Sequence, residues 1–90
     1  MAAKGEIGWT RRTEVGVKLK ICAEPNGDRW RFYSQAKRNE KWDEIPDPIL
    51  EDWESLLASI RRRMARRLMP PEAETRAIKE IRKRFPDAEL

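Results

Sequence analysis

Histidine is absent from this 90-residue chain, and cysteine occurs once, as Cys22. Without histidine the chain lacks the commonest general base and metal ligand, and it has no Ser-His or Cys-His nucleophile pair. A single cysteine excludes an intramolecular disulfide, on which small secreted domains often depend, and zinc sites of the usual kind are excluded as well. We therefore expect a non-enzymatic protein without cofactor or metal, in the reducing environment of the cytoplasm.

Long apolar runs are also absent. The longest, such as residues 21–23, have three residues, whereas a membrane-spanning helix needs about 20. Charged residues make up 40% of the chain and hydrophobic residues 39%, so the core must be small. We expect no membrane partner, and one small domain over residues 13–86 between a flexible arm of residues 1–12 and a tail of residues 87–90.

The basic charge is unevenly distributed along the chain. The formal net charge is only +4, but residues 61–84 contain ten basic and three acidic side chains. Residues 36–60, just before them, contain three basic and seven acidic side chains. This asymmetry favours an anionic partner.

Alternating polarity predicts a β-hairpin. After Thr13 the odd positions from Val15 to Ile21 are apolar, and a second alternating run carries Trp30 and Phe32; this pattern is typical of half-buried strands. Residues 25–28, Pro-Asn-Gly-Asp, form the turn between them. The strand positions expected on the buried face are Val15, Val17, Leu19, Ile21, Trp30 and Phe32.

The loop length determines the register of this hairpin. A four-residue loop of residues 25–28 keeps the apolar positions together and pairs Ile21 with Phe32 and Ala23 with Trp30. A two-residue Asn26-Gly27 loop has the same register but places Pro25 where a strand amide is wanted. We therefore expect the four-residue loop. The same pairing sets Cys22 beside Arg31.

The second half of the chain predicts two helices. Asp47 is expected to be the N-cap and Pro48 the first residue of a helix that ends at Met69, before two prolines. Its apolar side chains fall within an arc of about 120°, the width of a core-facing stripe. They are Ile49, Leu50, Trp53, Leu56, Leu57, Ile60, Met64 and Leu68. A second helix is expected over residues 71–85.

These elements predict an α+β fold. We expect an antiparallel β-hairpin packed on the long amphipathic helix, with the second helix folded back to form an αα-hairpin. Residues 41–45 are compatible with a short third strand, and the sheet needs either that strand or helix packing for stability. We expect Trp30, Phe32, Trp42 and Trp53 in the core, and we expect Trp9 to fold back over the edge of the core.

Two groups of side chains are candidate anion-binding sites. The first is the arginine-rich end of the first helix: Arg61, Arg62, Arg63, Arg66 and Arg67. Cations are also favoured there by the helix dipole alone, but five in seven positions exceed that need. The second is the polar face of the hairpin: Lys18, Lys20, Arg29, Arg31 and Tyr33. Ordinary polar-out alternation is the simpler explanation of this face.

A basic row on the second helix is a weaker candidate, since exposed helices often carry such rows. It consists of Arg76, Lys79, Arg82 and Lys83. For covalent chemistry only Cys22 stands out, because the charge of Arg31 would lower its thiol pKa, but no base or second cysteine accompanies it.

Two functions fit these features. One is a nucleic-acid-associated domain that binds phosphates, with DNA and RNA undistinguished, in which the arginine-rich end contributes most. The other is a protein-interaction module, such as an adaptor, inhibitor or regulatory subunit, that recognises an acidic protein by charge complementarity. The oligomeric state is left open.

Overall fold

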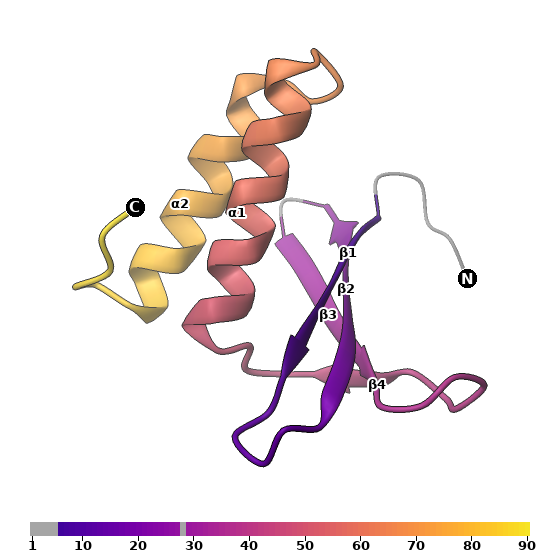
Figure 1. The fold of residues 1–90 in the computed structure, drawn as a ribbon. Coiled ribbons are helices and arrows are strands. Elements are labelled where there is room, and N and C mark those ends of the chain that lie inside the picture. Colours follow the sequence, from indigo (N-terminus) through magenta and orange to yellow (C-terminus); the bar gives the residue numbers. More distant parts are fainter. Residues whose placement is uncertain (1–5, 28) are drawn as a thin grey trace. The chain divides into compact units, whose positions relative to one another are not determined.

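The computed structural model describes residues 6–27 and 29–90, which divide into two compact units (Figure 1). The unit Met1–Pro48 contains an antiparallel sheet, and the unit Ile49–Leu90 contains two helices. This confirms the predicted α+β fold. The single domain over residues 13–86 and the packing of the sheet on the first helix stay predictions.

The sheet has four strands in the order β1-β2-β3-β4. Their bounds are Ile7–Arg12 for β1, Lys18–Asn26 for β2, Arg29–Gln35 for β3 and Asp43–Ile45 for β4. The predicted hairpin is β2 and β3. The third strand expected within residues 41–45 is confirmed as β4, which pairs with β3.

Strand β1 corrects the expectation of a flexible arm for residues 7–12, because they pair along β2, whereas residues 1–5 of the predicted arm lie outside the described residues. The strand alternates as a half-buried strand should: Ile7 is buried, and Trp9 meets the ring of Phe32 edge-on at a centroid distance of 6.0 Å. Gly8, Thr10 and Arg12 occupy the other face. The alternation was obscured by the small Gly8 and the charged residues around it.

The turn between β1 and β2 corrects the predicted start of the first hairpin strand. The Thr13 amide donates to the Val17 carbonyl at 2.8 Å, and the Gly16 amide donates to the Thr13 carbonyl at 2.9 Å. Gly16 has φ 85°, a conformation that favours glycine. Val15 is therefore 86% exposed and Val17 47% exposed, so neither is the buried strand residue that the alternation predicted.

The register of the β2–β3 hairpin differs from the prediction by two residues. Ala23 lies opposite Phe32, and Ile21 lies opposite Ser34. The loop is therefore Gly27 and Asp28, of which Asp28 lies outside the described residues. A shift of two residues leaves every side chain on its predicted face, so the apolar positions still share a face. The predicted pairing of Ile21 with Phe32 is nevertheless wrong.

Pro25 explains the error, because it lies within β2 opposite Trp30. In a two-residue hairpin the pair that flanks the loop is hydrogen-bonded, and the next pair is not. Pro25 is in that second pair. Its missing amide therefore removes no hydrogen bond between β2 and β3, and proline is tolerated there.

The helical unit consists of α1, Leu50–Ala65, and α2, Pro71–Arg84, packed side by side as the predicted αα-hairpin (Figure 1). Helix α2 matches its prediction to within one residue. Helix α1 is shorter than predicted at both ends. Its N-cap is Ile49 in extended conformation, without a side-chain hydrogen bond, and not Asp47.

At its other end α1 closes in a Schellman motif. The Arg67 amide donates to the Met64 carbonyl at 2.9 Å, and the Leu68 amide donates to the Arg63 carbonyl at 2.8 Å. Arg67 has φ 59°, in the left-handed region where glycine is usual. The helix therefore ends before Leu68, which is 67% exposed and not part of the apolar stripe.

The middle of the predicted stripe is buried. The buried side chains of α1 include Trp53, Leu56, Leu57 and Ile60, and those of α2 are Ala77 and Ile81. The guanidinium carbon of Arg84 lies 5.0 Å from the centre of the Trp53 ring. The core placement is confirmed for Phe32 and Trp53, whereas Trp30 and Trp42 are only half-buried. Neither helix is long and apolar enough to span a membrane.

Candidate functional site

One face of the sheet gathers basic side chains from three strands, and we call it the basic sheet face. In an antiparallel sheet, residues opposite each other point to the same side. Arg12 lies opposite Lys18, Glu24 opposite Arg31, and Cys22 opposite Tyr33. The basic sheet face therefore carries Arg12, Lys18, Lys20, Arg29, Arg31 and Tyr33. All five predicted sheet residues share this face, and Arg12 joins them because β1 extends it.

Among the described residues, the cations of the basic sheet face form no ion pairs with carboxylates. Lys18, Lys20, Arg29 and Arg31 are exposed, and within residues 6–27 and 29–90 none of them is in an ion pair. Arg12 donates to the neutral Gly16 carbonyl at 3.2 Å and forms no ion pair with any described residue. These charges are consequently available to an external anion.

A hollow of about 340 Å³ lies on the same face. Its walls include Gly8 and Thr10 of β1, Lys20 and Cys22 of β2, and Trp42, which precedes β4. Glu44 lies opposite Tyr33 on the basic sheet face. Trp42 is two residues before Glu44, and residues two apart in an extended segment point to the same side. This placement corrects the expectation that Trp42 is a core residue: it is half-buried and lines the hollow.

Cys22 forms part of the floor of this hollow and is 5% exposed. Burial raises the pKa of its thiol to about 12, and a hydrogen bond with Glu6 and the charge of that carboxylate act in the same direction. The expected lowering by Arg31 is wrong, because the actual register puts Tyr33 opposite Cys22. At neutral pH the thiol is protonated and a poor nucleophile.

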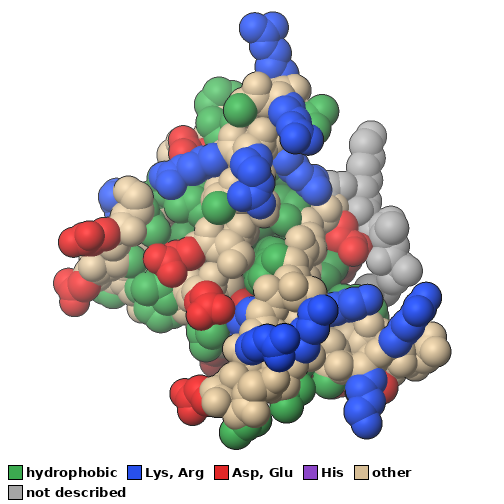
Figure 2. All heavy atoms as spheres, in the orientation of Figure 1, with side chains coloured by type: hydrophobic (Ala, Val, Ile, Leu, Met, Phe, Trp, Pro, Cys, Tyr) green, Lys and Arg blue, Asp and Glu red, His purple; other side chains and the backbone are tan. Residues whose placement is uncertain are grey.

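The arginine-rich end of α1 is partly engaged within the helical unit. The Arg61 Nε lies 2.6 Å from the Glu74 Oε2 of α2, and Arg62 donates to the Ser59 hydroxyl at 2.9 Å. Arg66 caps the helix, and Arg67 lies beyond it; both are exposed. Lys and Arg side chains gather around the connection between α1 and α2 (Figure 2).

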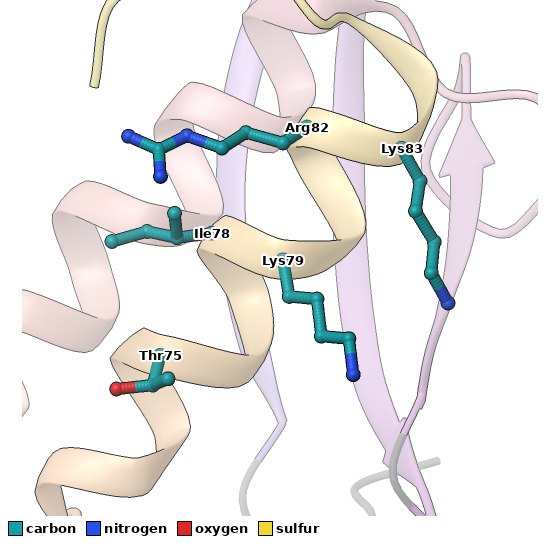
Figure 3. Close-up of a pocket in the computed structure, with 5 residues that line it drawn as sticks. All are labelled: Thr75, Ile78, Lys79, Arg82 and Lys83. Carbon is teal, nitrogen blue, oxygen red and sulfur yellow. The ribbon is translucent and has the colours of Figure 1, made fainter.

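The side chains of the basic row on α2 point in different directions. Thr75, Ile78, Lys79, Arg82 and Lys83 line an open groove of about 630 Å³. Arg82 and Ile78 extend to one side of the helix, whereas Lys79 and Lys83 extend to the other (Figure 3). Lys83 also lies 3.7 Å from Glu80. Because its cations do not converge, this row fits the solvated face that its spacing indicated.

Comparison with protein-family models, curated proteins and solved structures found no match to this chain.

Proposed function

We propose that this protein binds nucleic acid by phosphate contacts on the basic sheet face. The observation that carries the proposal is the set of exposed cations on adjacent strands of one sheet face, none ion-paired within the described residues. Neutralising phosphates with Lys and Arg releases condensed counterions, and this supplies most of the affinity of sequence-independent binding.

The spacing of the cations suits a polyanion. Lys18 and Lys20 are two residues apart on β2, and Arg29 and Arg31 are two apart on β3, which separates each pair by about 6.6 Å along its strand. Register places the first pair toward the β1–β2 turn and the second beside the β2–β3 loop. A ligand that meets both pairs must carry repeated negative charge over the length of the sheet, as a phosphate backbone does.

The arginine-rich end of α1 is the secondary contributor in this proposal. Its predicted dominance assumed five arginines projecting from a helix that continues to residue 69. The helix ends at Ala65, and Arg61 is neutralised by Glu74. Fewer of its charges are therefore available to phosphates than on the basic sheet face.

Two charge-removal variants test the proposal. The first replaces Lys18, Lys20, Arg29 and Arg31 with Gln; the matched control replaces Arg62, Arg63, Arg66 and Arg67 with Gln and removes the same charge. Affinity for a labelled oligonucleotide is measured by fluorescence anisotropy at low salt, after circular dichroism has verified folding. We expect the sheet variant to lose about tenfold or more and the control to lose less, because each lost phosphate contact weakens binding and reduces its salt dependence.

Two results would overturn the proposal. Equal losses in both variants would mean that only total charge matters. Parent binding that is micromolar or weaker at low salt and disappears at physiological salt would leave a generic basic surface. The alternative of an acidic protein partner would then take precedence.

A further inference from the structure

We infer that the hollow beside Trp42 accepts one unpaired nucleobase, so that the basic sheet face prefers single-stranded nucleic acid to duplex. This inference rests on the proposed function and specifies its substrate class. The observation is the juxtaposition of a tryptophan, a hollow and a lysine on the face whose cations form no ion pair within the described part of the chain.

The hollow arises from the local sequence. Gly8 lies opposite Cys22 and has no side chain to fill the space above that thiol. Thr10, two residues after Gly8 on β1, lies opposite Lys20. Two adjacent strands, β1 and β2, therefore line the hollow, and Trp42 lines it from the segment before β4. The volume of about 340 Å³ is at the lower end of the range for small-molecule pockets, about 300–1,000 Å³.

The polar groups of the hollow suit a neutral ring with hydrogen-bond donors better than a phosphate. Glu6 lines the hollow, and its carboxylate would repel an anion and could accept a hydrogen bond from the exocyclic amino group of a base. The Thr10 hydroxyl can donate or accept. Lys20 lines the hollow and is also one of the exposed cations, so a base in the hollow would place its own phosphate near a cation.

Strand pairing determines which nucleic acids can use the hollow. In a duplex the bases are stacked and paired, and only their edges are accessible. In a single strand a base can leave the stack at small cost and lie against an aromatic ring. Duplex DNA would therefore meet the cations but not the hollow.

The test compares a short oligodeoxycytidine with a duplex of the same length, by fluorescence anisotropy on the full chain. Trp42→Leu removes the aromatic wall. Gly8→Val fills the hollow without removing any charge; its backbone is not in the left-handed region, and an added Cβ would lie 3.5 Å from the Ile21 carbonyl oxygen, an ordinary contact. Trp30→Leu is the matched control, since Trp30 lies on the opposite face, paired with Pro25.

We expect Trp42→Leu and Gly8→Val each to lower single-strand affinity by about tenfold, the usual effect of losing one stacked base, and to change duplex affinity little. Trp30→Leu should leave both affinities unchanged. Equal parent affinity for both ligands, or Trp42→Leu and Gly8→Val variants that fold and bind single strands like the parent, would overturn this inference and leave the proposed function standing. Parent protein that binds neither ligand would overturn the proposed function itself.

Discussion

Replacing Arg67 with Gly should stabilise the helical unit, although it removes a charged side chain. Arg67 adopts φ 59° so that its amide and that of Leu68 can bond the last carbonyls of α1. In this conformation a residue with a Cβ is strained by about 1–2 kcal/mol. Glycine avoids that strain but loses about 0.5–1 kcal/mol through the greater freedom of the unfolded chain. The net expectation is about 0.5–1 kcal/mol of stabilisation.

The neighbouring Arg66 supplies the matched control. It has φ −94°, where glycine relieves no strain, so Arg66→Gly removes the same charge and should destabilise by about 0.5–1 kcal/mol. The assay is urea denaturation followed by far-ultraviolet circular dichroism. The dependence of the unfolding free energy on urea concentration should be the same in both variants, which makes their stabilities comparable. An Arg67→Gly variant no more stable than Arg66→Gly would refute the assignment of strain to the helix end.

Three further predictions concern the core and the thiol. Trp53→Ala should lower the free energy of unfolding by about 3–5 kcal/mol, because the ring is 2% exposed; a variant that melts like the parent would show that the ring is not a core residue. Val15→Ser should change stability by less than about 0.5 kcal/mol, whereas Ile21→Ala should cost about 2–5 kcal/mol; similar costs would contradict the turn at residues 13–17. The pKa of Cys22 is raised from 9.0 to about 12 in the folded protein, so the folded state retains this proton where the unfolded state has lost it. Stability should accordingly fall as the pH rises through this interval, less so in Cys22→Ala, and an identical fall in both proteins would be evidence against a buried neutral thiol.

The fold class could be predicted from the sequence, and so could which alternate residues of β2 and β3 share a face. Burial requires apolar residues at every second position of a strand, as at Ile21 and Phe32, and about every 3.6 positions of a helix, as at Trp53. These periods can be read from the sequence. The register was not accessible from pattern alone, because shifts of two residues preserve parity. It depended on whether Pro25 would be tolerated within a strand, and Pro25 is tolerated because its pair with Trp30 is not a hydrogen-bonded pair of β2 and β3.

The candidate site was predictable in part for the same reason. Parity placed Lys18 and Arg31 together, since every second residue of a strand must share a face. Arg12 and Trp42 were missed because their contributions depend on β1 and β4, which contain few apolar residues and acquire their place by pairing. The expected pKa of Cys22 failed with the register, since a shift of two residues exchanged Arg31 for Tyr33 as its neighbour.

The most direct test of phosphate binding on the basic sheet face is the salt dependence of single-strand affinity. For single strands, log affinity falls with log salt at a slope of about −0.7 for each phosphate neutralised. Replacing Lys18, Lys20, Arg29 and Arg31 with Gln should therefore make the slope shallower by up to about 2.8, if each cation meets one phosphate. A slope identical to that of the parent would contradict the account, because it would show that no phosphate is neutralised on this face.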